Sequence, residues 1–600
     1  MFNEVFAEHQ KTSPNCTGRL DFDYSSEEQR MFCWRERVIC DQCHYMSPKY
    51  NLYNEIETGK VGRKSATANI GLNIALSQTP IGPSSVRKIC LSTSIPAPSR
   101  RGLQKCANKV SKEIEKVNKN DMKARRQGLK TINLLRGRPA GEISVQSDGI
   151  FNNPLYSGIG KTPFQPATQC SYTMVENITP KKQVIALENV NKLCSKHGFH
   201  SVEDEEGCDI KSEQCSSTVP MEQSIGDEKE WAKACLLDLK KDHLEVKYIT
   251  TDPDTSAYKA AEELNMAKIT NSIPEHQIDT RHLAENHRKF IKNKSTVLAI
   301  MPGLTKSYRQ KLQNRFATDL SMRCQAEFES IHKQTRGDFK KMKTSIAETT
   351  AAIVNCYKGE HKLCRAHSSV CIGENDNNWI SKNEYVPNNF KININRDTDK
   401  TLRECIDFRF GPSILEKTKL NSNTQKVESV NHVIRRSLPK NVTYPRNFSG
   451  RAHSAIFSAN NGPGESIVRL CDAMGCPVPS NSRVSAALLT EQQISEKEKE
   501  RFRSNRRKIK RKMRRNKLFK MYEKHQEEIA YRKAQLLVKK AHTRLLNARI
   551  KKDHSYTINH IKVKNQLKNS ITKDHTYILR KSKRANHNIQ GGECSKEQAP

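Results

Sequence analysis

The chain has 600 residues, of which 35% are hydrophobic and 6% aromatic, so we expect one sizeable core with poorly packed flanks. Lys and Arg outnumber Asp and Glu by 103 to 65, and this surplus of +38 indicates a polyanionic partner: nucleic acid first, with an anionic membrane surface or an acidic protein as alternatives. No run approaches the roughly 18 apolar residues of a membrane span and the start resembles no signal peptide, so we expect no membrane insertion and no export, and the 19 cysteines should be reduced.

The N-terminal segment offers half of a metal site. Residues 1–30 are polar and without periodicity, so we expect a disordered start. Cys40 and Cys43 then form a CxxC pair, which supplies two zinc ligands. Its partners would be Cys33 or His44, or would be absent.

Helices are predicted in the remainder of the region 31–135. One covers about 67–78, a second starts near Ser84 after the Gly82-Pro83 turn, and a long polar helix starts at Ser99. Three helices separated by turns are typical of a helix-turn-helix-like DNA-binding module, and equally of any small helical domain.

Residues 140–480 show the pattern of an α/β fold. Residues 142–148 alternate apolar and polar side chains, as a half-buried strand does. We then expect a hairpin of strands 170–175 and 183–187, a helix over 223–241 and a strand over 244–251. A helix over 256–264, a weak strand over 276–279 and a helix from 281 follow. An antiparallel hairpin that leads into a parallel part is the order of a ribonuclease H-like mixed sheet. Residues of about 300–375 lack strand-like alternation and predict a helical insertion.

From about residue 490 to 600 the chain predicts a basic helical tail that ends in disorder. The run 506–517 holds nine Lys or Arg in twelve residues. Such a run can bind phosphates through counterion release, can act as a nuclear import signal, or can be a solvated helix. We expect a nuclear protein whose candidate nucleic-acid contacts are Arg506, Arg507, Lys508, Lys510, Arg511, Lys512, Arg514 and Arg515.

Three carboxylates are candidates for a catalytic site. Asp148 ends the first predicted strand and Asp252 the fourth, and these strands are neighbours in a sheet of this order. Glu428 lies in a predicted helix whose valines would pack on the sheet. Two-metal phosphoryl transfer needs acids around ions roughly 4 Å apart, and Mg²⁺ or Mn²⁺ prefers carboxylate oxygens. The alternative is that each aspartate only forms a turn, because an Asp at a strand end often does so.

Two further groups of cysteines and histidines are candidates for zinc. One reads C-x7-C-x2-H-x3-C, a compact spacing of tetrahedral ligands, and comprises Cys356, Cys364, His367 and Cys371. Its alternative is a pair of buried cysteines beside a surface histidine. The other group is looser, and His200 could replace its histidine: Cys194, His197, Cys208 and Cys215.

Seven segments, in order, resemble the animal Mutator-like transposase domain over roughly residues 31–480. Their order is more specific than any single motif. The segments are YNLYNEIETGKVGRKSATANIGLNIALSQTPIG, EISVQSDGIFNN, TPKKQVIALENVNKLC, VKYITTDPD, IDTRHL, CYKGEHKLCRAHSSVC and NTQKVESVNHVIRRSLPKNVTYPRN.

The resemblance implies an acid-triad transposase with a ribonuclease H-like fold. Asp148 in SDG, Asp252 in TTD and Glu428 in VESVN match the three acids. Such an enzyme hydrolyses a phosphodiester at transposon ends with Mg²⁺ or Mn²⁺ and directs the 3′-hydroxyl onto target DNA. The implied partner is double-stranded DNA, while self-association stays open.

The sequence departs from the family directly after the second acid. Pro253 stands where the family has glycine, so the turn that presents Asp252 is expected to differ. His282, in DTRH, lies where related transposases have Cys-x-x-His, and it would contact DNA, support the active site or only form a local hydrogen bond. The start is also short, so a fuller N-terminal metal module of the family is expected to be missing.

Two other functions fit the same features. An inactive, domesticated copy would act as a nuclear DNA-binding regulator. A mostly disordered basic scaffold would share the charge and the tail but would have no folded core.

Overall fold

The computed structural model describes most of the chain, and it divides into two compact units, Met1–Glu496 and Lys497–Pro600. No helix in the described portion is long and apolar enough to cross a membrane. The described residues are 1–57, 61–62, 64–154, 167–194, 198–199, 215–253, 255–373, 378–383, 385–387 and 390–553.

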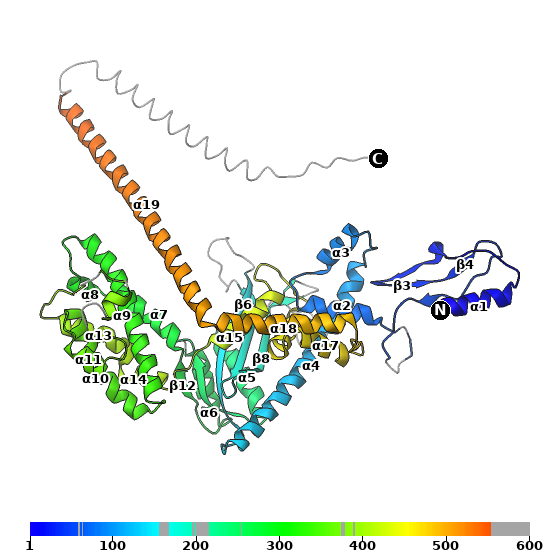
Figure 1. The fold of residues 1–600 in the computed structure, drawn as a ribbon, viewed down its shortest axis with the longest axis horizontal. Coiled ribbons are helices and arrows are strands. Elements are labelled where there is room, and N and C mark those ends of the chain that lie inside the picture. Colours follow the sequence, from blue (N-terminus) through cyan, green and yellow to red (C-terminus); the bar gives the residue numbers. More distant parts are fainter. Residues whose placement is uncertain are drawn as a thin grey trace. The chain divides into compact units, whose positions relative to one another are not determined.

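A five-stranded mixed sheet forms the centre of the first unit, with the strand order β12-β11-β6-β7-β8 (Figure 1). The strands β6, β7 and β8 pair antiparallel, whereas β11 runs parallel to both β6 and β12. The predicted strands, including the hairpin, are therefore confirmed. Their bounds are β6 (Glu142–Pro154), β7 (Ala167–Glu176), β8 (Val184–Asn191), β11 (Glu245–Thr251) and β12 (Glu275–Ile278).

Strand β6 is longer than predicted. The sequence predicts its end at Asp148, yet the strand continues to Pro154. The reason is that β11 pairs with β6 only as far as Gln146, while β7 continues to pair with it to Pro154. Asp148 therefore lies in the middle of β6, just beyond the parallel part of the sheet.

Helices cover both faces of the sheet. Helices α5 (Glu228–Lys241) and α6 (Ser256–Met266) share a hydrophobic cluster with one face, to which Val145 contributes. Helices α15 (Gln425–Ser437) and α16 (Phe448–Asn461) share a second cluster with the other face, to which Ile150 contributes. Because side chains alternate along a strand, the even-numbered residues of β6 around Asp148 face α15.

The start of the chain is ordered, which corrects the expectation for residues 1–30. It forms a helix followed by short strands in two small sheets, with pairing β1-β4 and β2-β3-β5. A metal-ligand cluster described below joins the helix to the strands, and this explains the order that polarity alone did not predict. The elements are α1 (Phe2–Thr12), β1 (Leu20–Phe22), β2 (Glu28–Arg30), β3 (Cys33–Glu36), β4 (Val38–Cys40) and β5 (Tyr50–Asn51).

The three helices predicted next are present. They are α2 (Thr67–Ser77), α3 (Pro83–Ser92) and α4 (Arg100–Leu135). Helix α4 packs against α2 and α16 and against strands of the central sheet, so this region is continuous with the α/β core.

A group of helices lies in the sequence between β12 and α15 and has its own hydrophobic core (Figure 1). The ion pair of Arg323 and Glu327 is buried inside this core, with a distance of 3.0 Å. The helices are α7 (Thr280–Asn293), α8 (Ser295–Ile300), α9 (Lys306–Gln334), α10 (Phe339–Lys358), α11 (Lys362–His367), α12 (Trp379–Asn383), α13 (Thr398–Phe410) and α14 (Pro412–Thr418).

The C-terminal part of the described chain is helical. It consists of α17 (Pro463–Ala473), α18 (Arg483–Arg503) and α19 (Asn505–Asp553). The basic run 506–517 lies within α19, and the side chain of Lys512 is outside what the structure describes. The disorder predicted for the end of the tail falls on residues after Asp553, which lie outside the described residues.

Candidate functional site

The first turn of α15 is fixed on the strand that carries Asp148. Oε1 of Gln146 accepts hydrogen bonds from the backbone N–H groups of Lys426 and Val427, at 3.2 and 3.1 Å. Gln146 and Asp148 are two residues apart and therefore point to the same face of β6. The contact thus brings the start of α15 to the side of the sheet on which Asp148 lies.

Asp148 itself is held by two neutral donors. Nδ2 of Asn431, in α15, donates to its Oδ2 at 2.8 Å, and the backbone N–H of Gly149 donates to its Oδ1 at 2.9 Å. Asn431 is one turn from Glu428 on the same face of the helix. One face of α15 therefore orients Asp148 through an amide and offers a carboxylate beside it.

Asp252 follows the last residue of β11, as predicted, and contacts the residue before α15. Oγ1 of Thr424 donates to Oδ1 of Asp252 at 3.2 Å and lies 2.7 Å from Oδ2 of Asp279. Asp279 caps α7, because its Oδ1 accepts from the N–H groups of Arg281 and His282. Although Pro253 follows it, Asp252 faces the other acids.

His282 connects two of the three predicted acids. Its Nε2 lies 2.9 Å from Oε1 of Glu428 and 3.5 Å from Oδ1 of Asp252. These three side chains are about two-fifths exposed, so solvent and a ligand can reach them. Strand β6, the end of β11 and helix α15 thus bring Asp148, Asp252 and Glu428 together, and α7 adds His282.

The electrostatics show that the acids share one space. Burial, together with the negative charges of Asp252 and Glu428, raises the pKa of Asp148 to about 6, although the Gly149 hydrogen bond opposes this shift. Burial also raises the pKa of Asp252, partly offset by His282.

The pKa of His282 is raised as well, but for this base burial opposes the shift. Partial burial works to lower its pKa, but the hydrogen bond to Glu428 and the charges of Asp252 and Asp279 raise it above the ordinary value. A cluster of acids that raise one another's pKa is a place where a cation is favoured.

Sequence reasoning missed two residues of this site. Asp279 and Thr424 were not candidates, although Asp279 begins the DTRH segment that drew attention to His282. Ligand atoms of Asp252, Asp279 and His282 lie within 4.8 Å of one another, a spacing at which they could hold a metal ion. Only the start of α7, which places an N-cap aspartate beside the tip of β11, reveals this role.

A Cys/His cluster lies in the core of the helical group. Its ligand atoms are within 4.8 Å of one another, which suits tetrahedral zinc, and it comprises Cys356, His361, Cys364 and Cys371. His361 stands in the place predicted for His367, with its Nδ1 3.8 Å from Sγ of Cys371. His367, the last residue of α11, instead lies 3.2 Å from Glu348 of α10, outside the cluster. Hydrogen bonds from Cys356 and Cys364 lower the pKa of the Cys371 thiol.

A second cluster completes the N-terminal CxxC pair. His9 and Cys16 join Cys40 and Cys43, with all ligand atoms within 4.8 Å of one another. The N–H of Gly18 donates to Sγ of Cys16 at 3.4 Å, as backbone amides do around a thiolate. The expected partners were wrong: Cys33 is in β3, outside the cluster, and His44 takes no part in it.

Gly18 and Cys43 show how closely this second cluster is built. A Cβ on Gly18 would meet Sγ of Cys40 at 2.5 Å, so the backbone must approach the sulfur closely there. A hydrogen bond from Ser13 contributes most to lowering the pKa of Cys43 to about 6. A thiol that ionises readily is suited to bind a cation.

The third predicted cysteine group is described only in part. Sγ of Cys215 lies 3.8 Å from Sγ of Cys194. His197 and Cys208, like the alternative His200, lie outside the described residues.

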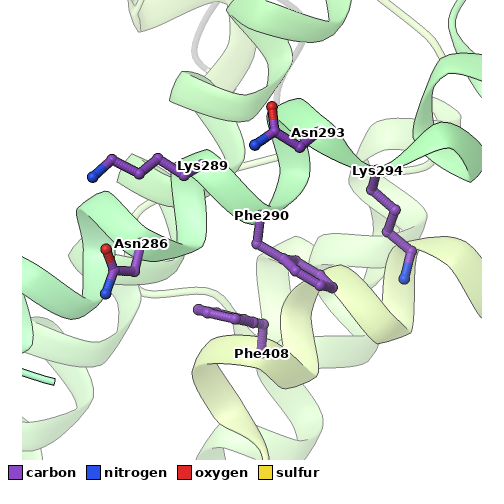
Figure 2. Close-up of a pocket in the computed structure, with 6 residues that line it drawn as sticks. All are labelled: Asn286, Lys289, Phe290, Asn293, Lys294 and Phe408. Carbon is purple, nitrogen blue, oxygen red and sulfur yellow. The ribbon is translucent and has the colours of Figure 1, made fainter. Parts of the chain in front are cut away.

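A separate hollow of about 520 Å³ lies farther along α7. Figure 2 shows Phe290 against Phe408 of α13, and their rings stack with centroids 4.6 Å apart. Lys294 lies over the Phe290 ring at 4.8 Å. None of the acids described above lines this hollow, so it is distinct from the carboxylate site.

Comparison with known proteins gives one family. A family model described as Mutator-like transposase matches residues 1–371 of the chain. This match includes Asp148, Asp252, His282 and both Cys/His clusters, and it ends before Glu428. No curated protein matches the chain.

Proposed function

Because this chain belongs to the Mutator-like transposase family, we propose that it is a transposase that cleaves phosphodiester bonds at transposon ends and joins the freed 3′-hydroxyl to target DNA. Membership of the family implies that DNA is its binding partner. The observation that carries the proposal is the convergence of Asp148, Asp252 and Glu428 from two strands and a helix.

The residues fit a hard divalent cation. Three carboxylates supply the oxygen ligands that Mg²⁺ or Mn²⁺ prefers. The repulsion among them, which contributes to the raised pKa of Asp148, would be relieved by such a cation. When bound, such ions activate the attacking water or 3′-hydroxyl and stabilise the leaving oxygen. The chain's own residues orient the ligands: Asn431 holds Asp148, Thr424 holds Asp252, and His282 links Asp252 to Glu428.

We propose further that the sheet is ribonuclease H-like. The strand order and directions support this: three antiparallel strands, then two strands parallel to the first of them. In this arrangement Asp148 on β6 and Asp252 after β11 come from adjacent strands, which explains how residues 104 positions apart meet.

Zinc and location complete the proposal. Both Cys/His clusters could bind zinc, and we assign it a structural role, because neither cluster contains an acid of the carboxylate site. The basic run 506–517 in α19 supports binding to phosphates and import into the nucleus.

The test is cleavage with the full chain. A plasmid carrying the genomic sequences that flank the coding locus is incubated with the protein and Mn²⁺, and strand breaks are mapped. We expect Asp148→Asn and Glu428→Gln each to reduce cleavage by about 10³-fold or more while DNA binding persists. Cleavage at the wild-type rate by either variant would refute the assignment of these acids.

A further inference from the structure

One face of α4 is an unbroken row of basic residues. From Arg101 to Lys123 the intervals are four, four, three, four, three and four residues, and such spacing keeps side chains on one side of a helix. All members are exposed. We call this row the α4 stripe: Arg101, Lys105, Lys109, Lys112, Lys116, Lys119 and Lys123.

The opposite face of α4 fixes the direction of the stripe. Leu103, Val110 and Ile114 are at most 3% exposed and pack in hydrophobic clusters with neighbouring elements. The helix cannot rotate without exposing these side chains, at about 1.5–3 kcal/mol each. The stripe is therefore held outward on a rigid element over about 33 Å, from the helical rise of about 1.5 Å per residue.

The charges of the stripe are only partly compensated within the protein, where Lys112 and Lys119 act on the carboxyl of Glu115 and Lys119 also acts on that of Glu188. Among the described residues, no carboxylate lies within 4.0 Å of five of its members. Neighbouring ammonium groups on one helix face repel one another. An external polyanion would relieve this repulsion. The five members are Arg101, Lys105, Lys116, Lys119 and Lys123.

We propose that the α4 stripe is a docking surface for the phosphate backbone of about one turn of duplex DNA, an inference that rests on the proposed function. The length of the stripe is close to the roughly 34 Å of one duplex turn. Helix α4 contains no aromatic residue, whereas surfaces for single strands use aromatic rings on which bases stack. Lysines that meet phosphates position the duplex without reading its sequence.

The test measures the salt dependence of DNA binding by the full chain. The probe is a fluorescent duplex of arbitrary sequence and about three helical turns, titrated between about 50 and 200 mM KCl. The stripe variant is Lys105→Gln/Lys116→Gln/Lys123→Gln. The matched control is Lys306→Gln/Lys311→Gln/Lys333→Gln, which removes three exposed lysines from α9.

We expect the stripe variant to lower the slope of log K against log salt by about 2 to 3, because each lost phosphate contact contributes roughly 0.9. The corresponding triple arginine variant should retain the wild-type slope, since it keeps the charges. A slope that is unchanged in the glutamine variant, or lowered equally in the α9 control, would overturn the proposal. An unchanged slope would leave an acidic protein as the partner of the stripe.

Failure of the stripe and failure of the proposed function are distinguishable. Binding needs no cleavage, so it is also measured on the Asp148→Asn chain. A lowered salt slope in the stripe variant, with no cleavage by the wild type, would contradict the transposase proposal alone. Cleavage by the wild type, with an unchanged salt slope in the stripe variant, would contradict the stripe proposal alone.

Discussion

Nε2 of His282 lies 2.9 Å from Oε1 of Glu428, which joins the first turn of α7 to the first turn of α15. The two residues are 146 positions apart, and the helices α8 to α14 lie between them in the sequence. The same imidazole reaches Asp252 at 3.5 Å. His282 therefore fixes the distance between a carboxylate from the sheet and one from a helix.

Replacing His282 should impair catalysis more than binding. We expect His282→Ala to lower the rate of Mn²⁺-dependent cleavage by about 10- to 100-fold, the usual cost of losing a residue that orients a metal ligand. The Mn²⁺ concentration needed for half-maximal cleavage should rise as well, which a purely structural role would not predict. Asn286→Ala, one turn along the same face of α7, is the matched control, and an equal loss there would contradict the role of His282.

Zinc content should separate His361 from His367. We expect His361→Ala to lower the zinc measured by mass spectrometry by one ion per chain, because its Nδ1 belongs to the cluster with three buried cysteines. His367→Ala should leave the zinc content unchanged, because that side chain faces Glu348. The reverse result would restore the ligand set predicted from sequence.

The N-terminal cluster makes an analogous prediction. We expect His9→Ala to remove one zinc ion and to loosen α1, which proteolysis of the first 50 residues would report. His44→Ala should do neither, because His44 stands outside the cluster although it adjoins Cys43. Equal zinc loss in both variants would show that the CxxC pair has other partners.

The sequence predicts the sheet well because a period of two along a strand depends on adjacent residues. Val145 and Ile143 therefore point to α5, and Asp148 to the other face, as soon as the strand is recognised. The third acid could be placed on a helix for the same reason, since Val427 and Val430 mark its buried side.

The remainder depends on tertiary contacts that no local pattern carries. His361 and His367 are equally close to Cys364 in sequence, and only the packing of α11 on α10 decides between them. His9 is 31 positions from Cys40, and a polar helix gives no sign that its histidine is buried at 3% exposure. Asp279 and Thr424 meet only because α7 and α15 start side by side.

Two buried histidines should make the fold sensitive to acid. Burial lowers the pKa of His287 to about 4 and that of His453 to about 3, where the ordinary value is 6.5. Nε2 of His287 donates to the carbonyl of Cys405 at 2.7 Å, and Asn118 donates to Nδ1 of His453 at 2.8 Å. Because burial lowers both pKa values, both rings are neutral in the fold near pH 7.

Since the folded-state pKa is depressed for these bases, the unfolded chain binds more protons between pH 6.5 and about 4. Their contribution to stability is therefore complete above pH 6.5 and is lost as the pH falls through this window, at up to about 1.4 kcal/mol per pH unit for each histidine. We expect His287→Gln to reduce the slope of the unfolding free energy against pH by that amount, measured by urea denaturation. His432→Gln, at an exposed position, controls for the loss of an imidazole, and a variant slope equal to that of the wild type would show that His287 is not neutral in the fold.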